Sequence, residues 1–188
     1  IDCHGHYTTA PQQLGDYRDA QVAALRDDPA HVGEKGTLDI SDDELRDSLE
    51  PNQLRLQRER GVDFTLFSAR ASWMGHHVGN EHTSQYWTEQ CNDLIRRICD
   101  LYPTNFAPVC QLPQSPGVAI DSSVRELRRC VEEMGFVGCN FNPDPSGGSR
   151  ACGHEVRIRR ASVMSEMSRL ASASSAPWSG WTSRSRSR

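Results

Sequence analysis

Short apolar stretches and amphipathic helical stretches alternate along the first 141 residues of this chain, and this alternation constrains its fold more than any other feature. The apolar stretches predict strands at residues 1–6, 64–68, 106–112 and 136–141. The helical spacing of apolar residues predicts helices at residues 12–26, 41–60, 85–101 and 122–134. In the second of these, Ser41 and Glu44 form a capping box, and Leu45, Leu49 and Leu56 share one face. Strands that alternate with helices form parallel βα units, so the sequence predicts an α/β fold.

The first predicted strand carries two histidines, His4 and His6, separated by Gly5. Side chains alternate along a strand, so the two imidazoles point to the same side, with Cα atoms roughly 6–7 Å apart. Histidine is a common metal ligand, and two converging imidazoles are able to hold one divalent ion. The pattern therefore predicts a metal site, with two surface histidines in a loop as the alternative interpretation.

Two parallel architectures fit the alternation: a doubly wound sheet and a (β/α)8 TIM barrel of the metal-dependent hydrolase type. The first strand is not followed by the Gly-x-Gly-x-x-Gly pattern of a dinucleotide-binding turn. A metal pair at the carboxyl end of the first strand favours the barrel, where functional residues gather at that end. Four βα units are half of such a barrel, so the predicted fold is its N-terminal half.

Charge and cysteine usage limit the function classes. The formal net charge of −4 divides into −10 for residues 1–148 and +6 for residues 149–188. A nucleic-acid-binding surface is expected to be basic, so the acidic body argues against that class. The seven scattered cysteines form no CxxC motif and predict free, buried thiols. No apolar run is long enough to span a membrane and no signal peptide is recognisable, so we expect no membrane partner and a cytoplasmic location.

Residues 149–188 differ from the body in composition: eleven of the forty are serine and eight are arginine. Their apolar residues show no clear strand or helix period, which predicts a disordered tail. The sequence thus divides into a partial barrel, residues 1–148, and a Ser/Arg-rich tail, residues 149–188.

Several segments of the body resemble a known family. They are Ile1-Asp2-Cys3-His4-Gly5-His6-Tyr7-Thr8, Asn52-Gln53-Leu54-Arg55-Leu56, Glu59-Arg60-Gly61, Phe67-Ser68-Ala69-Arg70-Ala71-Ser72, Leu112-Pro113-Gln114-Ser115-Pro116 and Gly138-Cys139-Asn140-Phe141-Asn142-Pro143-Asp144-Pro145. Together they resemble the 4-oxalomesaconate hydratases, a branch of the amidohydrolase superfamily of metal-dependent (β/α)8 barrels. The resemblance covers about residues 1–148. It implies water addition to the double bond of a small unsaturated keto-tricarboxylic acid, in bacterial degradation of protocatechuate or gallate.

The resemblance also implies roles for individual residues. His4 and His6 would be the first two ligands of a divalent metal ion, with zinc as the expected ion. Arg70 would bind a substrate carboxylate, with a local ion pair as the alternative. Asn140 and Asn142 would hydrogen-bond the substrate, although asparagines beside a proline also form turns. The family's later metal ligands and its general base lie beyond the matched region, so this chain alone is expected to be inactive.

Two other functions remain open at this point: a decarboxylase or hydrolase of the same superfamily acting on a small carboxylic acid, and a noncatalytic binding module with a basic tail. The tail also has a second interpretation, as an out-of-frame reading of the missing enzyme. Sliding the frame of residues 177–185 back by one nucleotide, with GC-rich codon choices, gives Met-Val-Arg-Met-Asp-Val-Pro-Leu-Pro. This segment is similar to Met-Val-Glu-Leu-Asp-Val-Pro of the resembled family.

Overall fold

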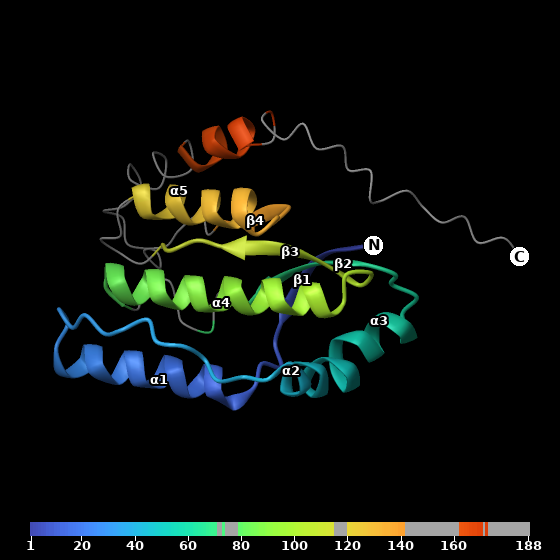
Figure 1. The fold of residues 1–188 in the computed structure, drawn as a ribbon, viewed down its shortest axis with the longest axis horizontal. Helices are drawn as coiled ribbons and strands as arrows, with labels where there is room; N and C mark the ends of the chain where they lie inside the picture. The colour runs from blue at the N-terminus through green and yellow to red at the C-terminus, as the bar shows by residue number, and fades with distance from the viewer. Residues whose placement is uncertain (71–72, 74–78, 115–119, 142–161, 171, 173–188) are drawn as a thin grey trace, which may run out of the picture.

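The computed structural model describes residues 1–70, 73, 79–114, 120–141, 162–170 and 172 (Figure 1). Four strands form one sheet: β1 (Asp2–Tyr7), β2 (Thr65–Ala69), β3 (Phe106–Gln111) and β4 (Gly138–Asn140). Helical segments connect them: α1 (Gln12–Asp27), α2 (Asp42–Leu49), η1 (Glu50–Leu54) and α3 (Arg55–Glu59) before β2, α4 (Glu81–Leu101) before β3, and α5 (Ile120–Arg128) with η3 (Arg129–Glu133) before β4. The predicted α/β fold is confirmed.

The strand order decides between the two predicted architectures. All three neighbouring pairs are parallel, and the order in space, β1-β2-β3-β4, is the order in sequence. A doubly wound sheet reverses its strand order at a switch point, whereas a barrel adds each strand beside the previous one. The described strands therefore have the arrangement of consecutive barrel strands.

The register of the sheet brings the carboxyl ends of the strands to one edge. His6 pairs with Ser68, which in turn pairs with Val109 of β3. At the carboxyl ends of β3 and β4, Gln111 lies opposite Asn140. Because all four strands are parallel, these polar side chains gather at the edge where barrel enzymes carry their active sites.

The core lies between the sheet and its helices, and α4 runs along the sheet in Figure 1. The helical spacing in α4 predicts its buried face correctly, since Trp87, Ile95 and Ile98 are all buried. Asn92 on the same helix is also fully buried, and its side chain contacts β3 and α5. A polar residue inside this core must be hydrogen-bonded, so Asn92 is a structural connection between elements.

The predicted capping box at Ser41 is confirmed, but the helix that follows changes its pitch at η1. Pro51 lies in this π-helical segment, where the wider turn shifts the phase of the side chains that follow. As a result Leu54 is buried, whereas Leu56, which the regular helical pattern predicts to face the core, is 36% exposed. That prediction is wrong for Leu56.

Part of the predicted tail has regular structure, so the expectation of disorder throughout residues 149–188 is wrong for residues 162–170, which are helical. This helix lies beside α5 (Figure 1), and Val163 and Leu170 are buried in the main core. Glu166 accepts a hydrogen bond from Arg128 of α5 at 2.6 Å. The physical reason is that Val163 and Leu170 are seven residues apart, two helical turns, and so share one face.

The structure also tests two predictions made from composition, on the cysteines and on membrane-spanning segments. The described cysteines are all free thiols, and the predicted burial is confirmed for Cys91, Cys99, Cys110 and Cys130. It is wrong for Cys3, which is exposed on the edge strand β1 of the described sheet, and Cys139 is half-buried. None of the helices in the described part of the chain has both the length and the apolar character needed to cross a bilayer.

Candidate metal site and substrate site

His4 and His6 meet at the carboxyl-terminal half of β1. Their Nε2 atoms are 3.0 Å apart and their ring centroids 4.5 Å apart. The two side chains therefore converge, as the alternation along a strand predicts, and they lie on a strand, where the alternative interpretation placed them in a loop. His6 is partly buried, while His4 is exposed at the edge of the sheet.

Gly5 lies between the two histidines and allows β1 to pack closely against β2. A Cβ atom on Gly5 would lie 2.3 Å from Cγ2 of Thr65 on β2, a distance that real side chains do not tolerate. The pairing of β1 with β2 is also irregular between Asp2 and Gly5. A glycine between the two histidines lets the strand approach β2 on one face while both imidazoles occupy the other.

The geometry of the pair fits a shared metal ion. Two nitrogen ligands on one tetrahedral zinc, each at about 2.0–2.1 Å, lie about 3.3 Å from each other. The separation of 3.0 Å between the two Nε2 atoms is close to that value. Among the described residues no group of three or more His, Cys, Asp and Glu side chains is arranged to hold a metal. The described part of the chain thus brings together the two predicted ligands, whereas a catalytic zinc ordinarily has three protein ligands.

The ring of His6 contacts a serine hydroxyl group on the neighbouring strand. Its Nδ1 atom is 2.7 Å from Oγ of Ser68 on β2. The same hydroxyl accepts a hydrogen bond from Nδ2 of Asn140 at 2.8 Å and donates one to the carbonyl of Gly5 at 3.2 Å. Burial and the neighbouring His4 lower the pKa of His6 and outweigh a hydrogen bond with the backbone of Ala69, which raises it. The lowered pKa favours the neutral ring, which is the form that binds metal.

The predicted substrate residues have different surroundings. Arg70 follows β2 directly and is exposed, and no hydrogen bond or ion pair joins its side chain to another residue in the described part of the chain. The predicted alternative, a local ion pair, therefore finds no support among those residues. Asn140 is brought beside the histidine pair through Ser68, and Asn142 lies outside the described residues.

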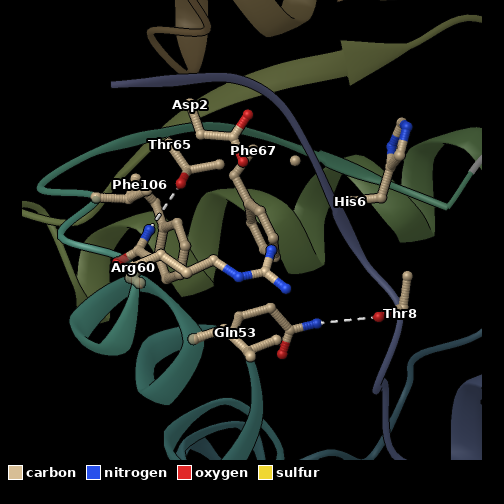
Figure 2. Close-up of a pocket in the computed structure, with 12 residues that line it drawn as sticks. Asp2, His6, Thr8, Gln53, Arg60, Thr65, Phe67 and Phe106 are labelled. Carbon is tan, nitrogen blue, oxygen red and sulfur yellow. Dashed lines mark hydrogen bonds between the residues drawn. The ribbon is translucent and has the colours of Figure 1, made fainter.

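A cavity of about 230 Å³ lies between β1 and α3. Figure 2 shows the Arg60 guanidinium reaching into it beside Gln53, which donates a hydrogen bond to Thr8 at 3.2 Å, while the ring of His6 points away. Phe67 and Phe106 form part of its apolar wall. His6 is one of the residues that line this cavity, although its ring points away from it, and His4 does not line it.

The contacts of Ser68 were not predicted from the sequence. The sequence marks it as a polar residue near the end of a strand, but nothing there predicts contacts to both His6 and Asn140. Its position opposite His6 in the register would have identified it, because neighbouring residues in parallel strands face the same side.

Comparison with known proteins identifies relatives of the body. A family model described as "Amidohydrolase" matches residues 1–167. A 2-keto-4-carboxy-3-hexenedioate hydratase of Sphingobium sp. is 52% identical over 148 residues, which are 79% of this chain and 42% of the relative. The crystal structure of a 4-oxalomesaconate hydratase from Rhodopseudomonas palustris is 42% identical, with a TM-score of 0.73, over 89% of this chain and 49% of that one. A gamma-resorcylate decarboxylase of Polaromonas sp. is 31% identical over 103 residues, 53% of this chain and 30% of the relative.

These relatives confirm the predicted resemblance and the predicted half-barrel. The chain spans about half the length of the hydratases that it matches. The family match also continues past position 148, where the sequence predicts the body to end, and includes part of the helix at residues 162–170.

Proposed function

This chain belongs to the amidohydrolase family, and from that premise we propose that it supplies the amino-terminal half of a metal-dependent hydratase that adds water to the double bond of 4-oxalomesaconate. The observation that carries the proposal is the convergence of the His4 and His6 Nε2 atoms at 3.0 Å on the first strand. The identity of 52% to a hydratase over 148 residues supports the reaction and the substrate, a small unsaturated keto-tricarboxylic acid.

In this proposal His4 and His6 hold a divalent ion, with zinc as the expected metal. When bound, such an ion activates water or polarises the oxygens of a substrate. Arg70 follows the carboxyl end of β2 and has no side-chain partner among the described residues, and in this proposal its guanidinium group binds one of the substrate's carboxylates. Asn142 remains a predicted hydrogen-bonding partner of the substrate.

The remaining metal ligands and the general base are expected from the part of the barrel that this chain does not span. Because the described residues provide only a pair of ligands, we expect the chain alone to bind metal weakly and to be inactive. A tetrahedral catalytic zinc ordinarily has three protein ligands and a water molecule. The free thiols of the described residues are typical of a reducing compartment, which supports the cytoplasm as its location.

The superfamily alternative is decarboxylation of an aromatic acid. Its support is the identity of 31% over 103 residues to a decarboxylase, which is lower and shorter than the identity to the hydratase. The noncatalytic alternative, nucleic-acid binding through the tail, is opposed by the charge of −10 on residues 1–148.

A chimaera tests the proposal directly. Residues 1–141 of this chain are joined to the remaining carboxyl-terminal part of the Sphingobium hydratase. The chimaera is then assayed with 4-oxalomesaconate and with 2,6-dihydroxybenzoate. We expect hydration of 4-oxalomesaconate and loss of both activity and stoichiometric zinc in the His4→Ala and His6→Ala variants.

The matched control is His82→Ala, which removes a histidine at the start of α4 that contacts Tyr86 and leaves the pair on β1 intact. This control should keep both zinc and activity. A folded chimaera that decarboxylates the aromatic acid and leaves 4-oxalomesaconate unchanged would contradict the proposed reaction. Zinc retained in the double variant His4→Ala, His6→Ala would contradict the metal assignment.

A further inference from the structure

The hydroxyl of Ser68 joins three strands at the candidate metal site. It lies on β2, is 2% exposed, and contacts Nδ1 of His6, Nδ2 of Asn140 and the carbonyl oxygen of Gly5 at 2.7, 2.8 and 3.2 Å. His6 and Gly5 belong to β1, and Asn140 ends β4. One buried oxygen atom therefore organises a hydrogen-bond network around the ring of a predicted ligand.

Counting donors and acceptors in this network fixes the direction of each hydrogen bond. A serine hydroxyl has one hydrogen to donate and two lone pairs that accept. The Gly5 carbonyl only accepts, so it takes the hydroxyl hydrogen, and the Asn140 amide nitrogen only donates, so it takes one lone pair. The remaining lone pair must accept a hydrogen from Nδ1 of His6. Reversing the Asn140 amide would leave two acceptors competing for a single hydroxyl hydrogen, which is less favourable.

This directionality selects one tautomer of His6. With its hydrogen on Nδ1, the neutral ring carries a lone pair on Nε2, the atom that faces Nε2 of His4 at 3.0 Å. In water the neutral imidazole of histidine prefers the opposite form, with hydrogen on Nε2, which cannot bind a metal through that atom. The network therefore stabilises the less common form where that form is needed.

We propose that Ser68 and Asn140 are positioning residues that hold His6 in the Nδ1–H tautomer, with Nε2 presented to the metal. The role of His6 as a ligand rests on the proposed function, but the tautomer does not. Asn140 then acts through Ser68, in place of the direct contact with substrate that its position at a strand end suggests. Hydrogen bonds of this kind from a metal-ligating histidine to a second group fix ring orientation and raise ligand affinity.

The tautomer is measured by long-range ¹H–¹⁵N correlation spectra of the histidine rings in the whole, metal-free chain at pH 8. We expect the Nδ1–H pattern for His6 in the wild type, and a shift to the Nε2–H pattern in Ser68→Ala. Ser68→Thr keeps a hydroxyl and should retain the wild-type pattern. Asn140→Ala removes one donor to the hydroxyl and should give a mixture of the two forms.

Ser48→Ala is the matched control, because it removes a hydroxyl that bonds to Tyr7 at 2.6 Å, one residue from His6, without touching the ring. Its His6 signals should be those of the wild type. An Nε2–H pattern in the wild type, or an unchanged pattern in Ser68→Ala, overturns the inference, and the Asn140→Ala variant provides a second test if Ser68→Ala does not fold.

Zinc titration in competition with a chelator separates this inference from the proposed function. Ser68→Ala should weaken zinc binding by about 10–100-fold while Ser68→Thr restores it. Loss of the Nδ1–H pattern with no change in zinc affinity contradicts the link between tautomer and metal. Zinc binding that is indifferent to His4→Ala and His6→Ala contradicts the proposed function itself, whatever the tautomer.

Discussion

Replacing Asn92 with alanine should destabilise this protein more than any substitution on its surface. Asn92 lies in the middle of α4 and is 0% exposed. Its Nδ2 atom donates to the carbonyl of Gln111 at 3.1 Å and to Oε1 of Glu126 at 2.7 Å, and its Oδ1 atom accepts from the amide of Gln111 at 3.0 Å. One side chain thus connects α4 to β3 and to α5.

The expected magnitude follows from the groups that alanine leaves behind. Both backbone groups of Gln111 lose a buried partner, and each buried group left without one costs about 1–3 kcal/mol. The Glu126 carboxylate keeps Arg129 at 2.8 Å, so its loss is smaller. We therefore expect Asn92→Ala to lower the free energy of unfolding by about 3 kcal/mol, a large share of the roughly 5–15 kcal/mol that domains have.

The assay is urea unfolding followed by far-ultraviolet circular dichroism at low protein concentration. With a denaturant dependence of about 2 kcal/mol per molar urea, the unfolding midpoint should fall by about 1.5 M. Asn52→Ala is the control, since it removes one bond to the Ser48 carbonyl at 2.8 Å in a half-buried position and should cost under about 1 kcal/mol. An Asn92→Ala midpoint within the error of the Asn52→Ala midpoint, at an unchanged slope, would refute this reasoning.

Three further predictions follow from local structure and from the sequence. Ser41→Ala should cost about 1 kcal/mol in urea unfolding, because it removes one half of the capping box shared with Glu44, whereas Ser41→Thr should cost little. Glu166→Gln should lower the thermal midpoint at pH 7, because hydrogen bonds from Arg169 and Arg128 lower the pKa of Glu166 to about 2. Since that stabilisation requires the ionised carboxylate, the difference from wild type should shrink as the pH falls from about 4.5 towards 2. Sequencing the coding DNA should reveal the missing family segment in another frame beyond position 148, and an immediate stop codon in that frame would contradict the out-of-frame interpretation.

The arrangement of the fold was predictable because local patterns agree with one another along most of the body. The capping residues at Ser41, the helical spacing in α4 and the apolar strand runs all point to the same βα units. The prediction for Leu56 was wrong because a π-helical turn at Pro51 changes the phase of a helix, and hydrophobic spacing assumes a constant phase.

The helix at residues 162–170 was missed for a different reason. Its buried positions, Val163 and Leu170, have helical spacing, but they are surrounded by Ser and Arg residues. Composition averaged over forty residues hides a pattern of this length. What stabilises the helix is its packing beside α5, and contact with a distant element is not visible in a short sequence window.

The histidine pair was predictable from the sequence, but the hydrogen bonds around it were not. The difference lies in the sequence separation of the residues involved. Convergence of His4 and His6 follows from the alternation of side chains within a single strand. The contacts of Ser68 with His6 and with Asn140 depend on how β1, β2 and β4 are aligned with one another, which is a property of the folded sheet. A sequence motif predicts the histidine pair, whereas the residues that contact it follow from the sheet register.

The position of β1 explains why this half of the site should bind metal only weakly. Within the described residues β1 has one neighbouring strand, β2, and its opposite edge has no strand beside it. His6 is therefore oriented by residues of β2, Ser68 and the backbone of Ala69, while His4 is exposed. An edge strand with one partner resists displacement less than a strand paired on both sides, so the 3.0 Å approach of the two Nε2 atoms is held by few contacts. Joining the chain to a carboxyl-terminal half should therefore increase zinc affinity in two ways: it supplies the remaining ligands, and it pairs the free edge of β1 so that His4 becomes as well ordered as His6.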